Sequence, residues 1–98
     1  MFMVEYSKRV IFMIRIWAKT IKNGRIVKQY LFEREGETDY SEFFDYLKSI
    51  CEALDIPTPV LIKTHLFNYA KYNNVKFKQD DFVENIHFDK FILENALL

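Results

Sequence analysis

Cys51 together with His65 or His87 could supply two of the three members of a nucleophilic triad. A nucleophilic triad needs a thiol or hydroxyl, a histidine base and a third group that orients the base. Cys51 lies between Leu47 and Leu54 in an apolar pattern, where a thiol packs as a small hydrophobic group and nothing favours its thiolate. The sequence therefore predicts a structural cysteine and no catalytic residue.

The histidines do not indicate a metal site. His65 follows Ile62 by three residues and precedes Tyr69 by four, so it borders an apolar helical stripe and is expected to pack there. His87 lies in an acidic segment, whose carboxylates are Asp80, Asp81, Glu84 and Asp89. Imidazole and carboxylates suit a divalent cation, but an EF-hand calcium loop needs alternating acids around a central glycine. We expect a solvated acidic turn and no metal.

Glycine is scarce, and its placement excludes the common nucleotide-binding loops. A phosphate-binding loop needs several glycines so that backbone amides can approach the anion, whereas Gly24 and Gly36 stand alone in unrelated turns. We therefore expect no cofactor and a protein that is not an enzyme.

The composition indicates a small folded protein. Hydrophobic residues make up 50% of the 98 residues and aromatic residues 17%, while glycine and proline are rare, so residues 1–98 are expected to form a single domain. No apolar run approaches the roughly 18 residues of a membrane-spanning helix. One cysteine cannot form an internal disulfide, and the first residues do not resemble a secretory signal. We expect a cytoplasmic protein without membrane partners.

Charge alternates in blocks along a chain whose net charge is zero. Residues 1–30 carry +6, residues 31–55 carry −6, residues 56–79 carry +4 and residues 80–98 carry −4. Blocks of this kind usually neutralise one another across neighbouring elements or lie on solvated faces. Alternatively, one basic surface remains after folding and meets an anionic partner.

Residues 9–20 and 25–34 are rich in β-branched and aromatic types and predict two antiparallel strands joined at Asn23-Gly24. The register stays open at this stage. A two-residue loop places a basic and aromatic set on one face, consisting of Arg15, Trp17, Lys19, Lys28, Tyr30 and Phe32. A longer loop with a bulge instead moves Tyr30 and Phe32 to the face of Ile14 and Ile16.

Two helices are predicted after the hairpin. The first begins after Thr38 or Asp39 and carries one apolar stripe, formed by Tyr40, Phe43, Phe44, Leu47, Ile50, Cys51 and Leu54. Proline ends it, and Thr58 followed by Pro59 predicts the N-terminus of a second helix that reaches about Tyr72. Residues 75–78 and 90–95 then predict a short pair of strands, although residues 90–95 also match helical spacing.

These elements predict an α+β fold in the order β-β-α-α-β-β, with one antiparallel sheet and both helices on one face. Three segments also carry a resemblance, namely residues 54–59 (LDIPTP), 80–84 (DDFVE) and 88–89 (FD). With these the chain resembles small uncharacterised bacterial proteins of the same length. The resemblance covers nearly the whole chain and implies a bacterial, cytosolic protein, but no activity, cofactor or site residue.

The second sheet face is more apolar than a solvated face normally is, which predicts a protein-interaction or homodimerising module. The candidate interface residues are Ile11, Met13, Trp17 and Tyr30. The alternative is single-stranded nucleic acid binding through the basic and aromatic hairpin face described above, since bases stack on rings and phosphates meet cations.

Overall fold

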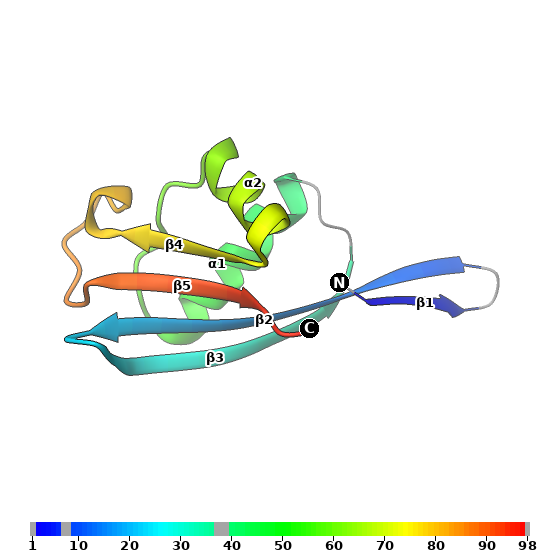
Figure 1. The fold of residues 1–98 in the computed structure, drawn as a ribbon, viewed down its shortest axis with the longest axis horizontal. Helices are drawn as coiled ribbons and strands as arrows, with labels where there is room; N and C mark the ends of the chain where they lie inside the picture. Colours follow the sequence, from blue (N-terminus) through cyan, green and yellow to red (C-terminus); the bar gives the residue numbers. More distant parts are fainter. Residues whose placement is uncertain (1, 7–8, 37–39, 98) are drawn as a thin grey trace.

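The computed structural model describes residues 2–6, 9–36 and 40–97, with side chains for residues 13–36 and 41–97. The elements follow the chain as β1 (Phe2–Tyr6), β2 (Arg9–Lys22), β3 (Arg25–Glu35), α1 (Tyr40–Leu54), α2 (Lys63–Tyr72), β4 (Asn74–Lys78), the 3-10 helix η1 (Gln79–Asp81) and β5 (Lys90–Asn95). The predicted α+β class is confirmed, and β1 is an additional strand at the N-terminal end (Figure 1).

All strand pairs of the sheet are antiparallel, and β2 is its organising strand. Met13 pairs with Phe2 of β1 and with Glu35 of β3, so β1 and β3 lie on opposite edges of β2. β5 pairs with residues 16–21 of β2, next to β1 along the same edge. The strands therefore lie in the order β3-β2-β5-β4, with β1 continuing the β5 edge at the other end of β2.

Both helices cover one face of the sheet, and the buried residues form one cluster there. Alternate residues of β2 point to this face because side chains alternate along a strand. Ile14, Ile16 and Ala18 are almost completely buried. The apolar stripe of α1 packs over them through Phe43, Tyr46, Leu47, Ile50, Cys51 and Leu54, while Val75, Phe77, Phe91 and Leu93 complete the cluster from β4 and β5.

Most predicted boundaries are confirmed. α1 begins at Tyr40, while its two candidate N-cap residues, Thr38 and Asp39, lie outside the described residues. α2 ends at Tyr72 as predicted, where Asn73 follows in a left-handed conformation with φ 60°. The ambiguous tail is a strand, β5.

The predicted start of the second helix at Thr58 and Pro59 is wrong, because α2 begins only at Lys63. Hydrogen bonds to other parts of the chain hold the backbone between Thr58 and Lys63 outside a helix. The backbone N–H of Val60 donates to the carbonyl oxygen of Asp81 at 2.8 Å. The N–H of Ile62 donates to Nδ1 of His65 at 3.1 Å, so a histidine side chain caps the helix.

A bulge in β3 decides the hairpin register. Asn23 and Gly24 form a two-residue turn with positive φ angles of 54° and 75°, which matches the predicted turn. Thr20 then pairs with Lys28 while Ile21 pairs with Ile26, which leaves Val27 as the extra residue. The turn therefore has two residues, but Tyr30 and Phe32 lie on the helix-covered face.

Within the described ranges, no helix is long and apolar enough to cross a membrane.

Candidate functional site

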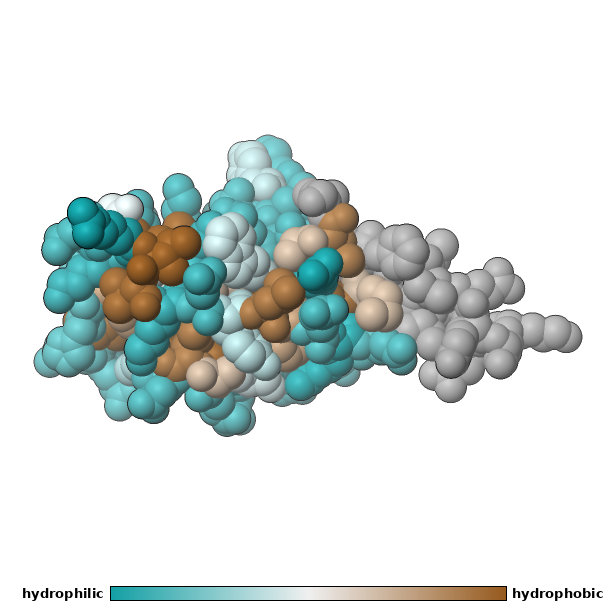
Figure 2. Space-filling model, turned by 90° about the horizontal axis from the view of Figure 1, so that it is seen from below, coloured by the Kyte–Doolittle hydropathy of each residue, from teal (hydrophilic) through white to brown (hydrophobic). Residues whose placement is uncertain are grey.

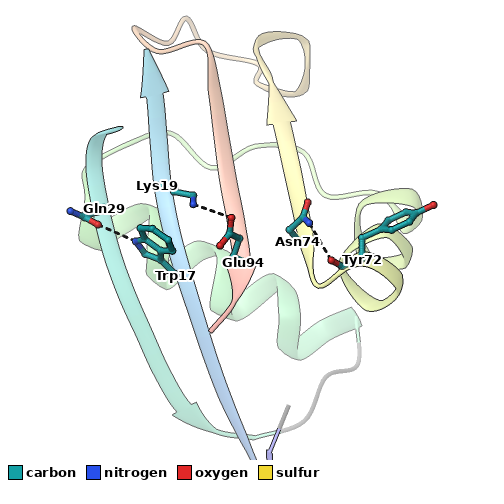
Figure 3. A network of polar contacts seen from close by, with 6 residues as sticks. All are labelled: Trp17, Lys19, Gln29, Tyr72, Asn74 and Glu94. Carbon is teal, nitrogen blue, oxygen red and sulfur yellow. Dashed lines mark hydrogen bonds and ion pairs between the residues drawn. The ribbon is translucent and has the colours of Figure 1, made fainter. Parts of the chain in front are cut away.

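The face of the sheet opposite the helices has Trp17 near its centre (Figure 3). Trp17 pairs with Leu31 of β3 on one side and with Glu94 of β5 on the other. Its indole Nε1 donates a hydrogen bond to Oε1 of Gln29 at 3.1 Å, and Nζ of Lys19 lies 3.7 Å from the ring centroid. These side chains leave the indole half-buried on a face that no described helix covers. We call this surface the open face.

Two cations on the open face have a carboxylate partner on a neighbouring strand. Lys19 Nζ contacts Glu94 Oε1 at 2.9 Å, and Arg15 Nε lies 3.9 Å from Glu33 Oε2. Helix α1, which belongs to the acidic block, packs on the opposite face and cannot neutralise these cations. The carboxylates that neutralise Arg15 and Lys19 therefore come from the neighbouring strands β3 and β5 and not from the acidic helix.

The basic and aromatic constellation proposed from the two-residue loop does not share one face, and this expectation is wrong. Lys28, Tyr30 and Phe32 pair with Thr20, Ala18 and Ile16, which belong to the helix-covered face. The bulge at Val27 causes this change.

Lys28 and Phe32 contact helix α1 on the helix-covered face. Lys28 Nζ donates to the carbonyl oxygen of Leu54 at 2.9 Å, at the C-terminus of α1. Phe32 is 4% exposed and its ring lies 5.4 Å from that of Tyr46. Tyr30 is 40% exposed but lies on this side as well, so it does not join Trp17 in a common interface.

The remaining candidate interface residues, Ile11 and Met13, have the same parity as Trp17 along β2. Met13 is half-buried, and the side chain of Ile11 lies outside the described residues. Leu31, which is 41% exposed, and Ile92 extend the apolar surface beside Trp17. Leu31 and Ile92 could not be selected from the sequence, because only the strand pairing places Leu31 opposite Trp17 and Ile92 opposite Lys19.

Exposed apolar side chains also mark β3, where Ile26 and Val27 are largely exposed. Seen from the side on which β3 lies in Figure 1, apolar residues form separate patches divided by hydrophilic ones (Figure 2). A partner on this side of the molecule would therefore meet hydrophilic residues as well as apolar ones.

A cavity of about 630 Å³ lies between α2 and the edge of β2. Its walls are mainly apolar and include Met13, Ile14 and Ile16 of β2, Phe43 of α1, Leu66, Phe67, Tyr69 and Ala70 of α2, and Leu97. The volume is in the range of ligand sites, which is roughly 300–1,000 Å³. Leu66 and Tyr69 also pack against the core, whereas Phe67 is exposed and lies outside the apolar stripe of α2.

The two histidines differ in their surroundings: His65 has structural contacts, whereas His87 is exposed. His65 is buried, with its ring 4.5 Å from that of Phe77 and its Nε2 3.6 Å from Asp81. His87 and Asp55 border a second cavity of about 270 Å³, but no hydrogen bond between them is found among the described residues. No group of His, Cys, Asp and Glu suited to a metal ion occurs within the described ranges.

Cys51 is almost completely buried, and burial raises the pKa of its thiol from about 9 to about 12, although a hydrogen bond with Thr58 acts in the opposite direction. Because the folded pKa is above the unfolded one, this group stabilises the fold most below about pH 9 and loses that effect as the pH rises toward 12. The thiol is therefore a packing group at neutral pH.

We expect Cys51 to react with a thiol reagent at pH 8 at least about 100-fold more slowly in buffer than in denaturing urea, because reaction requires opening of the core. The absorbance of the released chromophore measures the rate. A native rate close to the denatured one would contradict a structural role for this cysteine.

No family model matches the chain, and neither a curated protein nor a solved structure does. The proposals below therefore depend on the geometry of the chain itself.

Proposed function

We propose that this protein is a non-enzymatic homodimerising module, in which a second copy covers the open face of the sheet. The observation that carries the proposal is the position of Trp17, which lies on the face opposite both helices and remains half-buried. The free, buried Cys51 fits a reducing compartment, so we include a bacterial cytoplasm in the proposal.

The surroundings of Trp17 favour a protein partner. An aromatic ring supplies a large contact area, and tryptophan is enriched among the residues that dominate interface energies. Leu31 extends this contact from β3. The pairs Lys19–Glu94 and Arg15–Glu33 reduce the cost of removing these charges from water, because each cation keeps a carboxylate beside it.

A second copy is the partner that this surface suits best. A two-fold axis brings the same surface of both molecules together, so each indole can pack against the apolar residues beside the other one. Because opposite charges alternate across the strands, a small shift between two such faces sets cations against carboxylates.

We expect Trp17→Ala to weaken the dimer by at least about 30-fold in Kd, which corresponds to about 2 kcal/mol for a central aromatic residue. Sedimentation equilibrium over a range of concentrations measures the change. Val83→Ala is the control, since Val83 is 89% exposed and lies in the loop between η1 and β5, outside the strands of the sheet. Equal Kd values for the two variants would contradict the role of Trp17.

A further inference from the structure

The cavity between α2 and β2 has an apolar floor. Ile14, Ile16 and Phe43 line it, and each of them is at most 5% exposed. They come from the helix-covered face of β2 and from the buried side of α1. Leu66 and Tyr69 of α2 also line the cavity and pack against the same core. A ligand group that reaches this depth therefore meets mainly apolar surface.

The exposed part of the lining carries positive charge. Lys63, at the start of α2, and Arg15 of β2 both line the cavity and are exposed. The described residues of the lining include no aspartate or glutamate. Arg15 Nε lies 3.9 Å from Oε2 of Glu33, whereas Lys63 forms no ion pair with any described residue. Lys63 is therefore a cation at the cavity without a carboxylate partner in the described chain.

The two amide side chains of the lining bind groups of the chain itself. Nδ2 of Asn95 donates to Oδ1 of Asn73 at 3.4 Å, and Oδ1 of Asn95 accepts the backbone N–H of Leu97 at 3.0 Å. The N–H of Ala96 donates to the carbonyl oxygen of Arg15 at 2.8 Å, which fixes the end of the chain against β2. These contacts build the wall of the cavity and leave the two cations as the groups suited to a charged ligand.

We propose that this cavity binds a fatty carboxylate, whose alkyl chain lies along the apolar floor and whose carboxylate lies at the exposed end beside Lys63. Mainly apolar walls with a few polar groups are typical of small-molecule sites of this volume. Burial of the alkyl chain favours binding in proportion to the apolar area removed from water. A lining with charges of one sign attracts a ligand of the opposite sign, and Arg15 adds to this field.

Isothermal titration calorimetry with fatty carboxylates of different length tests the site. Octanoate, decanoate and dodecanoate, each below its micelle concentration, are expected to bind at one molecule per chain. Kd should fall at least about 5-fold with each two added methylene groups, because each methylene adds buried apolar area. A Kd that does not change with chain length, or no saturable binding of dodecanoate, would overturn the inference.

The charge of the head group is tested with dodecyltrimethylammonium, which has the same alkyl chain and the opposite charge. We expect it to bind at least about 10-fold more weakly than dodecanoate, since the described lining offers it cations and no carboxylate. Equal affinities for the two ligands would show that the cavity selects only the chain, and they would overturn the assignment of a carboxylate.

Charge reversal at Lys63 tests the position of the carboxylate. Lys63→Glu is expected to weaken dodecanoate binding at least about 10-fold and to leave the circular dichroism spectrum unchanged. Lys48→Glu is the matched control, because Lys48 is an exposed lysine of α1 that does not line the cavity. Equal Kd values for the two variants would overturn the role of Lys63.

A substitution inside the lining tests the position of the alkyl chain. Ala70 is an exposed residue of α2 that lines the cavity, and Ala70→Trp places a large ring there. This variant is expected to bind dodecanoate at least about 10-fold more weakly than Ala53→Trp. Ala53 is an exposed alanine of α1 outside the lining, so it serves as the matched control. Equal affinities would show that dodecanoate binds elsewhere and would overturn the inference.

Discussion

Phe91→Ala is expected to lower the free energy of unfolding by about 3–5 kcal/mol, the usual cost of deleting a buried aromatic ring. Phe91 is fully buried in β5, the strand that joins β2 to β4. It lies opposite Thr20 and Phe77, and its ring is 6.0 Å from that of Phe77. The cavity left by the substitution therefore lies where both strand pairs meet, and total stability is usually only about 5–15 kcal/mol.

Urea denaturation monitored by circular dichroism measures this loss. Ile92→Ala is the control, because Ile92 is the next residue of the same strand but lies on the open face and is half-buried. We expect its cost to be less than half that of Phe91→Ala. Equal losses for the two variants would contradict the assignment of the core to the helix-covered face.

Gly36→Ala is expected to cost about 1–3 kcal/mol, the usual range for forcing extra volume into a packed site. Gly36 follows β3, and a Cβ at this position would collide with the hydroxyl of Tyr46. Tyr46 is fully buried in α1 and cannot move aside without disturbing its contacts with Phe32. The glycine therefore allows the end of β3 to approach the helix.

A double-mutant cycle with Tyr46→Phe isolates this collision. Without the hydroxyl, the nearest ring atom lies 3.4 Å from the added Cβ, which is close to ordinary contact. Gly36→Ala should therefore cost less in the Tyr46→Phe background than in the wild type, with a coupling of at least about 0.5 kcal/mol. Additive costs in the two backgrounds would show that the glycine serves another purpose.

Local signals predicted most of the elements. Asn23-Gly24 specified the turn because both residues tolerate positive φ, and the spacing of apolar residues specified α1. Asn73 ended α2 for the same local reason. These features depend on a few neighbouring residues, so they can be recognised without knowledge of the tertiary structure.

Long-range contacts decided the features that local patterns missed. The backbone N–H of Val60 donates to Asp81, far along the chain, and the N–H of Ile62 donates to the His65 side chain, so the predicted first turn of α2 does not form. The bulge at Val27 is likewise not marked by a glycine, although it decides which side of β3 faces the helices.

The sequence predicted the candidate interface only in part, because one of its residues depends on long-range strand pairing. Trp17 lies on the open face, as the alternation along β2 indicates, whereas Tyr30 depends on the register across two strands and lies on the other face. The cavity could not be predicted, because it results from β1 and β5 sharing one edge of β2 beneath α2.

The solution mass tests the homodimer most directly. Sedimentation equilibrium of the wild-type chain at about 100 µM should give twice the monomer mass of 11.9 kDa, with dissociation upon dilution. A mass of 11.9 kDa that does not change up to that concentration would show that no second copy of the chain covers Trp17, and it would contradict the proposed homodimer.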